Sequence, residues 1–344
     1  MEIKELIREN IKSLQPYSSA RDEFKEMSSA FTFMDANENP FESGLNRYPD
    51  PQQNLVKEAL SKIKGVSKEH ILLGNGSDEV LDLIFRVFCE PKEDQVIVLP
   101  PTYGMYEVLA KMNDIKLITI PLLDNFQPNI KKVVKVQNNN TKVLFLCSPN
   151  NPTANSFDSN TIEILLKEFN GIIVIDEAYI DFSIEDSWLS RLDEFPNLIV
   201  TQTLSKAYGL AGIRLGICYA SQEIISILNK IKPPYNVNQL TQDVALKALL
   251  NRDEVNNQIT AITSERNQLI KDLEKLDIVD KVYASDANFL LVKVDNANLR
   301  YEQLLNNGIV VRNRSNQMLC ENCLRFTIGT KDENKKLITT LKSI

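Results

Sequence analysis

Short apolar runs alternate with amphipathic stretches from the start of the chain to about residue 230. The runs are rich in Ile, Leu and Val, which is typical of buried strands. Behind several runs, apolar residues recur every three to four positions, as they do from Val80 to Phe88, and this spacing predicts a helix with one buried face. Strands that alternate with helices predict a parallel or mixed α/β sheet. We predict strands at 71–73, 95–99, 115–120, 143–147, 172–175, 198–201 and 215–220.

The pattern changes after Pro233 and Pro234, which mark a break in the chain. A long amphipathic helix is predicted from about residue 253 to 276, and the last part of the chain then mixes short strands with helices. The predicted strands there are 288–294, 309–311 and 324–328, and the predicted helices are 299–305 and 333–341. We therefore expect an N-terminal arm (1–35) that packs with the small domain, a large α/β domain (36–240) and a small α+β domain (241–344).

Composition and charge exclude several classes of protein. The chain has 344 residues, 43% hydrophobic and 25% charged, as in ordinary soluble globular proteins. A net charge of -7 disfavours broad binding of nucleic acid. No apolar run is long enough to span a membrane, and the charged N-terminal start does not resemble a secretory signal. We expect a cytoplasmic protein with neither nucleic acid nor membrane as a partner.

Cysteine and histidine usage narrows the chemistry. The five cysteines are odd in number and scattered, which argues against a disulfide framework. Cys320 and Cys323 form a lone CxxC with no second pair to complete a zinc site, so we expect no metal. The single histidine, His70, lies in a polar stretch and is expected to be solvated. A Ser-His-Asp or Cys-His hydrolase and a histidine-ligated metal enzyme are therefore disfavoured.

The stretch 203–214 carries one lysine among small and apolar neighbours, directly after a predicted strand. A lysine in such surroundings can lose its charge and act as an amine nucleophile, here Lys206. Ser205 and Arg214 beside it suit a phosphate. A carbonyl compound that carries a phosphate fits both, and pyridoxal phosphate is such a compound. A solvated surface loop remains the alternative for this stretch taken alone.

Other predicted strands also end in polar residues. Residues 74–79 (GNGSDE) open a predicted helix, whose free N–H groups would form a phosphate cradle or simply an ordinary capped helix end. Tyr103 and Asp176 follow strands at the edge where α/β folds place ligands. Asp176 is placed to meet a buried cationic group. The polar residues that suit one common ligand are Ser77, Asp78, Tyr103, Asn151, Asp176, Tyr179, Ser205 and Lys206.

In the order and spacing of six motifs, the chain resembles the fold-type I pyridoxal-phosphate aminotransferases, and among them the histidinol-phosphate aminotransferase family. Three motifs are shared by many aminotransferases, and the other three, with Pro16 and Tyr17, point to the narrower family. The resemblance implies a large domain with a mostly parallel seven-stranded sheet flanked by helices, and a smaller α+β domain. The six motifs are 35–40 (DANENP), 47–49 (RYP), 101–106 (PTYGMY), 148–153 (SPNNPT), 176–179 (DEAY) and 203–207 (TLSKA).

The resemblance also implies a role for each position that would bind the cofactor, pyridoxal 5′-phosphate. Lys206 would form a Schiff base with it and shuttle the substrate's α-proton. Asp176 would keep the ring nitrogen protonated, so that the ring is an electron sink. Tyr103 would stack on the ring, and Asn151 and Tyr179 would bind its hydroxyl. The implied phosphate contacts are Gly76, Ser77, Asp78, Ser205, Arg214 and, from the neighbouring subunit of a homodimer, Tyr48.

At the substrate end, the resemblance implies that Arg325 binds the α-carboxylate of glutamate and, in the other half-reaction, the phosphate of histidinol phosphate. A guanidinium fork matches either anion. Tyr17, Asn37 and Arg312 are further substrate candidates, against a hinge aromatic, a turn residue and a solvated arginine as alternatives. The implied reaction is reversible amino transfer between L-histidinol phosphate and 2-oxoglutarate, which gives imidazole acetol phosphate and L-glutamate in histidine biosynthesis.

Alternatives on the same scaffold are an aromatic or other amino-acid aminotransferase and a threonine-phosphate decarboxylase. A protein of another class, which keeps the fold and binds ligand without catalysis, is a further alternative. One position departs from the family: Ala154 stands where a glycine usually follows Asn-Pro-Thr. If that position needs a positive φ, the alanine strains it modestly. The CxxC is expected to pack beside the strand of Arg325.

Overall fold

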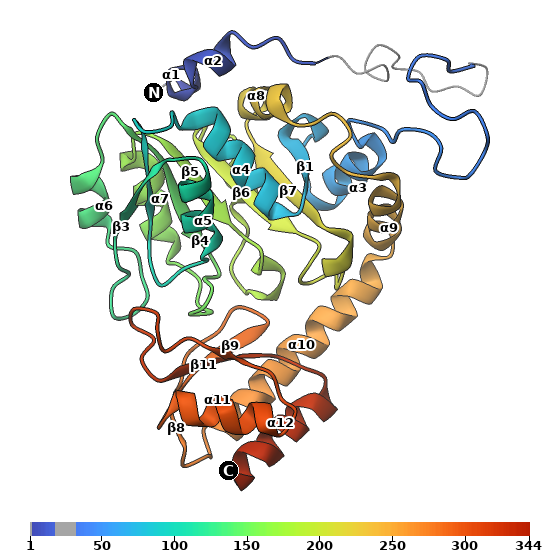
Figure 1. Cartoon of the computed structure of the whole chain (residues 1–344). Helices are drawn as coiled ribbons and strands as arrows, with labels where there is room; N and C mark the ends of the chain where they lie inside the picture. The colour runs from blue at the N-terminus through green and yellow to red at the C-terminus, as the bar shows by residue number, and fades with distance from the viewer. Residues whose placement is uncertain (1, 18–31) are drawn as a thin grey trace.

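A seven-stranded sheet forms the centre of the large domain in the computed structural model, which describes residues 2–17 and 32–344 (Figure 1). All strands are parallel except β7, which runs antiparallel to both neighbours, so the mostly parallel sheet is confirmed. The ends of each strand predicted for this sheet lie within two residues of the observed ends. In spatial order the strands are β1 (Ile71–Asn75), β7 (Leu215–Ala220), β6 (Leu198–Thr203), β5 (Ile172–Asp176), β4 (Thr141–Cys147), β2 (Gln95–Val98) and β3 (Lys116–Thr119).

Helices cover both faces of this sheet, because alternate residues of each buried strand point to opposite sides. On β5, Ile172 and Val174 pack with one set of helices, whereas Ile173 and Ile175 pack with the other. The first set is α4 (Ser77–Phe88), α5 (Met105–Met112) and α8 (Gln222–Ile231). The second set is α3 (Asn54–Lys64), α6 (Ile130–Val136), α7 (Ser159–Glu168) and α9 (Gln239–Leu250).

The small domain is an antiparallel sheet of four strands with helices packed on it, which confirms the predicted α+β unit. One predicted strand is wrong: residues 309–311 form no ladder, although Ile309 and Val311 pack on the core, and pairing begins at Arg312. The half-exposed strand β8 was not predicted, because apolar and polar residues alternate too weakly along it. The elements are α10 (Arg252–Leu273), β8 (Val279–Val282), β9 (Phe289–Val294), α11 (Ala297–Asn306), β10 (Arg312–Asn313), β11 (Cys323–Thr327) and α12 (Lys331–Ser343).

The boundary between the domains lies later than the sequence predicts. Helix α9 packs against α3, and its residues Ala245 and Leu249 belong to the core of the large domain. The chain leaves that domain at Asn251, where α10 starts and runs down to the small domain (Figure 1). The boundary at residue 240 is therefore wrong by about one helix, because the proline pair is followed by a further helix of the large domain.

The N-terminal arm also packs differently from the prediction. Its helices α1 (Ile3–Leu6) and α2 (Glu9–Lys12) lie on the side of the large domain away from the small domain (Figure 1). Their apolar residues are buried against α4 and α8, and Arg8 forms an ion pair with Glu90 at 3.0 Å. Packing on the small domain is therefore wrong for this part of the arm. The sequence also predicts a break in the arm at residues 16–21, which fall largely outside the described residues.

Four short 3₁₀ helices complete the described elements: η1 (Lys68–His70), η2 (Ile180–Phe182), η3 (Trp188–Arg191) and η4 (Ala211–Ile213). Within residues 2–17 and 32–344, no helix has both the length and the apolar content needed to cross a membrane.

Candidate active site

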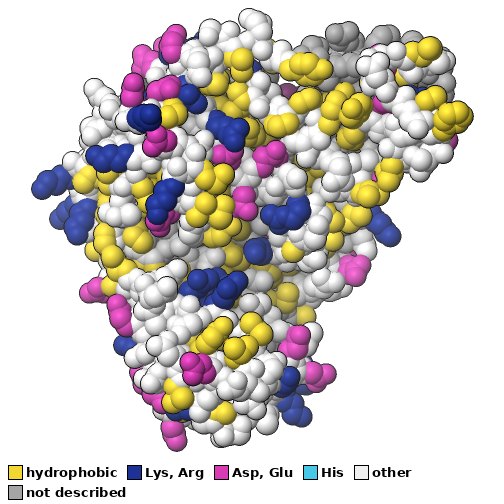
Figure 2. Space-filling model, in the orientation of Figure 1, with side chains coloured by type: hydrophobic (Ala, Val, Ile, Leu, Met, Phe, Trp, Pro, Cys, Tyr) yellow, Lys and Arg dark blue, Asp and Glu magenta, His cyan; other side chains and the backbone are white. Residues whose placement is uncertain are grey.

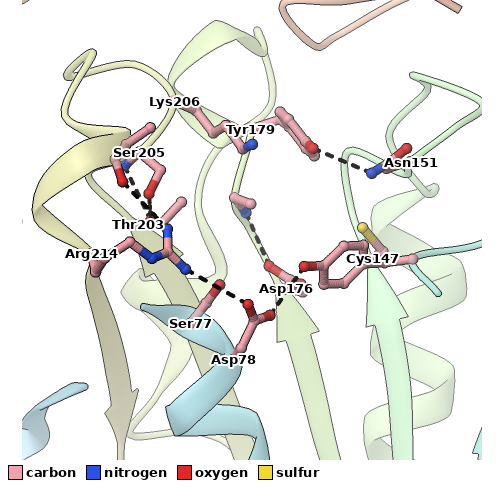
Figure 3. Close-up of a pocket in the computed structure, with 13 residues that line it drawn as sticks. Ser77, Asp78, Cys147, Asn151, Asp176, Tyr179, Thr203, Ser205, Lys206 and Arg214 are labelled. Atoms are coloured by element: carbon pink, nitrogen blue, oxygen red, sulfur yellow. Dashed lines mark hydrogen bonds and ion pairs between the residues drawn. The ribbon is translucent and has the colours of Figure 1, made fainter. Parts of the chain in front are cut away.

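A cavity of about 130 Å³ lies at the carboxyl ends of the parallel strands, the edge where α/β folds hold ligands (Figure 3). Its wall comes from the ends of β4, β5 and β6, the start of α4 and the loop before β7. Most residues that the sequence singles out for a common ligand meet here. The lining residues are Ser77, Asp78, Tyr103, Cys147, Asn151, Asp176, Ala178, Tyr179, Thr203, Ser205, Lys206, Ala211 and Arg214.

One end of the cavity is built for an anion. Helix α4 begins at Ser77, after Gly76 with a φ of 80°, so its first N–H groups and the positive end of its dipole face this end. A Cβ atom on Gly76 would lie 2.6 Å from Arg214 Nη2, and one on Gly216 would lie 2.3 Å from the Ser77 nitrogen. The two glycines therefore let the helix start and the Arg214 loop meet closely. This set of donors fits a phosphate group.

The cavity also holds a buried carboxylate. Asp176 is the last residue of the fully buried strand β5 and is 3% exposed. The Tyr106 hydroxyl donates to Asp176 Oδ2 at 2.9 Å, and the Ala178 N–H donates to Oδ1 at 3.2 Å. Burial raises the pKa of Asp176, and the hydrogen bond from Tyr106 opposes that rise. A buried carboxylate of this kind suits a protonated ring nitrogen.

Tyr106 belongs to the motif at 101–106, and its role could not be predicted from the motif alone. The residue lies three positions after Tyr103, on the buried side of α5, and its ring stacks on Phe145 with 4.8 Å between centroids. A buried tyrosine needs a partner for its hydroxyl, which was the signal available in the sequence. The partner is Asp176, so Tyr106 holds the carboxylate from behind.

Lys206 lies at the rim of the cavity, in the turn after β6. The Ser205 N–H donates to Thr203 Oγ1 at 3.1 Å, and the Gly209 N–H donates to the Lys206 carbonyl at 3.1 Å, where a φ of 65° at Gly209 completes the turn. Partial burial lowers the pKa of Lys206, and so does the positive charge of Arg325. A lysine with a lowered pKa reaches the neutral, nucleophilic form more readily.

Arg325 reaches the site from the small domain. Arg325 Nη1, from β11, donates to Asn151 Oδ1, while Asn151 Nδ2 donates to the Tyr179 hydroxyl at 3.4 Å. The guanidinium lies over the Phe289 ring, 5.1 Å from its centroid. On the far wall, the Tyr103 hydroxyl donates to Asp78 Oδ1 at 3.0 Å. The cavity therefore has an amine, a carboxylate and an anion cradle, and Arg325 contacts its wall through Asn151.

Comparison with known proteins identifies the family. A model of aminotransferase class I and II matches residues 27–341. The chain belongs to this family. It is therefore a pyridoxal-phosphate-dependent aminotransferase, and the cavity's phosphate cradle, carboxylate and lysine fit that cofactor.

Curated and solved relatives agree with this assignment. Histidinol-phosphate aminotransferase from Christiangramia forsetii is 61% identical over 342 residues, which cover 99% of this chain and 98% of the relative. The structure of histidinol-phosphate aminotransferase from Clostridium acetobutylicum has a TM-score of 0.80 at 24% identity, and covers 87% of this chain and 91% of that one. The Sinorhizobium meliloti enzyme in complex with pyridoxal-5′-phosphate has a TM-score of 0.78 at 23% identity, covering 86% and 82%. The two structures establish the fold-type I architecture.

Six residues that were expected at the site do not line the cavity of this aminotransferase chain: Gly76 and Arg325 adjoin its lining residues Ser77 and Asn151, and the other four are Tyr48, Asn37, Tyr17 and Arg312. Tyr48 and Asn37 line a separate cavity of about 420 Å³, where Tyr48 stacks on Tyr235 at 4.4 Å between centroids. Tyr17 is 77% exposed. Arg312 lies opposite Arg325 in the ladder between β10 and β11, and its side chain is exposed. Roles for these four residues therefore depend on a second subunit or on bound substrate.

Ala154, which stands where the family usually has glycine, has a backbone conformation that favours glycine. Its φ is 70°, its side chain is fully buried, and its carbonyl accepts from the Asp286 N–H at 2.8 Å. The suspected positive φ is therefore confirmed, and the aminotransferase carries alanine where glycine would be unstrained.

All five cysteines of the aminotransferase are free and buried. Cys320 and Cys323 pack in the large core cluster, and Cys323 begins the strand of Arg325, as predicted. Burial raises the pKa of Cys320 to about 12 and that of Cys323 to about 11, so both thiols are protonated at neutral pH. The described part of the chain holds no cluster of three His, Cys, Asp or Glu side chains that would bind a metal.

Proposed function

We propose that this aminotransferase transfers an amino group reversibly between L-histidinol phosphate and 2-oxoglutarate, giving imidazole acetol phosphate and L-glutamate in histidine biosynthesis. The observation that carries the proposal is Arg325, which enters the site from the small domain and contacts Asn151. Its Nε is buried and has no hydrogen-bond partner among the described residues. An anionic substituent held there leaves the substrate's amino carbon facing Lys206. The name of the Christiangramia forsetii relative supports the same substrate.

The cofactor contacts follow the chemistry of the lining residues. When bound, pyridoxal phosphate supplies an electron-withdrawing ring conjugated to the reacting carbon–nitrogen bond. Lys206 Nζ would hold the cofactor through a C=N bond; once the substrate's amine has displaced it, the free lysine amine would take the proton from the substrate's α-carbon. Asp176 keeps the ring nitrogen protonated, and Tyr103 covers the ring face. Asn151 and Tyr179 bind the ring hydroxyl, and the phosphate lies on Gly76, Ser77, Asp78, Ser205 and Arg214.

The substrate contacts alternate between half-reactions. Arg325 binds the α-carboxylate of glutamate in one and the phosphate of histidinol phosphate in the other, because its planar fork of donors matches either anion. Tyr17, Asn37 and Arg312 close the substrate end of the cleft in this proposal.

We further propose a homodimer, in which Tyr48 reaches the cofactor phosphate of the neighbouring subunit. The segment around Tyr48 leaves the body of the large domain and exposes large apolar side chains, with Met34 90% and Phe41 81% exposed. Figure 2 shows hydrophobic side chains gathered over this part of the molecule, at the upper right. A second copy would bury them. We also place the enzyme in the cytoplasm, since five free buried thiols suit a reducing compartment.

A panel of amino donors tested with 2-oxoglutarate checks the proposed substrate. We expect the highest kcat/KM with histidinol phosphate. A preference for phenylalanine or tyrosine would make the protein an aromatic aminotransferase instead, and release of CO₂ from threonine phosphate would make it a decarboxylase. Absence of turnover with every donor, despite bound cofactor, would favour a binding protein. Light scattering tests the dimer, which a monomeric mass would refute.

A further inference from the structure

Three arginines lie on one face of the hairpin formed by β10 and β11. Arg312 is the direct cross-strand partner of Arg325. Arg314 follows two residues after Arg312, and its N–H donates to the Cys323 carbonyl at 2.9 Å, which continues the ladder. Residues two apart on a strand, and residues paired across strands, share a face of the sheet. The side chains of all three arginines therefore leave the hairpin on the same side.

This face of the hairpin points toward the active site. The residues that flank Arg325, Leu324 and Phe326, point the other way, into the core of the small domain. Arg325 itself reaches Asn151, and Arg314 lies on the same face of the hairpin as Arg325. Figure 2 shows basic side chains at the level of the cleft between the two domains. Arg314 therefore belongs to the wall of the substrate cleft.

The three guanidinium groups lack acidic partners. In residues 2–17 and 32–344, the arginines that form ion pairs within 4.0 Å are others in the chain. Arg314 Nε and Arg325 Nε are buried and have no hydrogen-bond partner in this part of the protein. The same holds for Ser315 Oγ and Gln317 Oε1, which follow Arg314 in the same loop. Four buried polar atoms without partners therefore gather on this hairpin and its loop.

Like charges held together without counter-charges cost free energy, and a bound anion relieves that cost. Burial and the charge of Arg312 lower the pKa of Arg314, whereas burial and the charge of Arg314 lower that of Arg325. One guanidinium fork is sufficient for a carboxylate, which has two oxygens and one charge. A phosphate monoester has three free oxygens and nearly two charges at neutral pH. Three guanidiniums on one face of the hairpin match the phosphate better.

We propose that Arg314 is a specificity-determining residue: with Arg312 and Arg325, it binds the dianionic phosphate monoester of one substrate and contributes little to binding the carboxylate of the other. This inference rests on the proposed function, which supplies histidinol phosphate as the phosphate-bearing substrate and glutamate as the carboxylate. Arg325 serves both half-reactions, whereas Arg314 serves the one with the larger anion.

The test separates the two half-reactions in the holoenzyme by following the cofactor absorbance in single-turnover experiments. We expect Arg314→Gln to weaken the apparent affinity for histidinol phosphate by about ten- to a hundred-fold, the usual range for one charge-assisted contact. The affinity for glutamate should change by less than about three-fold, which is less than the loss of one such contact would cause. Arg314→Lys, which keeps the charge and loses the fork, should lie between wild type and Arg314→Gln for histidinol phosphate.

Arg300→Gln is the matched control, because Arg300 lies in the same domain and pairs with Asp295 at 2.6 Å away from the cleft. It should change neither affinity. Equal weakening of both substrates by Arg314→Gln, or no weakening of either, would overturn the proposal.

Inorganic phosphate provides a readout that does not depend on the natural substrate. In the wild-type holoenzyme it should compete with glutamate, and Arg314→Gln should raise its inhibition constant by about ten-fold. An inhibition constant that is the same in both proteins would overturn the role of Arg314. If the wild type rejects histidinol phosphate while phosphate inhibition still depends on Arg314, the proposed function fails and the dianion site stands.

Discussion

Tyr106→Phe removes the hydroxyl that donates to Asp176 Oδ2 at 2.9 Å and changes little else. The phenylalanine ring keeps the stacking on Phe145, since only one oxygen atom is lost. Asp176 keeps the bond from the Ala178 N–H, so its side chain stays in place. The variant therefore tests how far one hydrogen bond keeps this buried carboxyl group ionised.

A hydrogen bond to a charged group stabilises it by about 1.5–3 kcal/mol, and each pKa unit corresponds to about 1.4 kcal/mol. Loss of the bond should therefore raise the pKa of Asp176 further, above a value that burial already raises. The ionised form is the one that attracts a protonated ring nitrogen. Binding of the cofactor should consequently weaken, and weaken more as the pH falls.

The assay is a titration of the apo-protein with pyridoxal phosphate across a range of pH, followed by visible absorbance. We expect the variant to bind about ten-fold less tightly at neutral pH, as the loss of about 1.4 kcal/mol implies, and to lose affinity at a higher pH than wild type. Phe145→Leu is the control: it disturbs the packing of the Tyr106 ring but leaves the hydroxyl, so it should lower stability without moving the pH dependence. Identical pH profiles for Tyr106→Phe and wild type would refute the reasoning.

Two predictions concern stability in urea unfolding. Ala154→Val should lower the free energy of unfolding by about 2–4 kcal/mol, because it forces a β-branched residue to a positive φ at a buried position. Ala154→Gly should change the free energy of unfolding by less than about 1 kcal/mol. Equal effects of the two substitutions would show that the positive φ does not matter. Burial and Lys232 lower the pKa of Lys57 from 10.5 to about 8. Between those pH values the unfolded chain binds more protons, so stability should rise with pH across that window. Lys57→Met should abolish this rise and should increase the free energy of unfolding at pH 7 by at most about 3 kcal/mol. If the variant keeps the pH dependence of the wild type, Lys57 is not its cause.

The arrangement of the large domain could be predicted because the apolar pattern of each strand is enough to identify it. A run such as Ile172 to Ile175 is apolar at every position, which only a strand buried on both faces requires. The polar residue that ends such a strand then lies at the ligand edge, which placed Asp176 and the lysine turn correctly. The predicted anion cradle at Ser77 followed from glycines that open a helix.

The errors arose where tertiary partners decide the outcome. Nothing in α9 itself shows that it packs on α3, so the domain boundary was placed too early. Helices α1 and α2 have an apolar face that could pack on either domain, and in the structure this face packs on α4 and α8. Tyr106 was passed over because its role needs a contact across 70 positions. Arg314 was not singled out because its meaning depends on the pairing of Arg312 with Arg325.

The central claim is that Lys206 is the amine that holds the cofactor, and reductive trapping tests it directly. The holoenzyme is treated with borohydride, digested and analysed by mass spectrometry for the lysine that carries the pyridoxyl group. We predict the modification on the peptide that contains Lys206, and no covalently retained cofactor in Lys206→Ala. Modification of another lysine, such as Lys57 or Lys232, with Lys206 unmodified, would contradict the account.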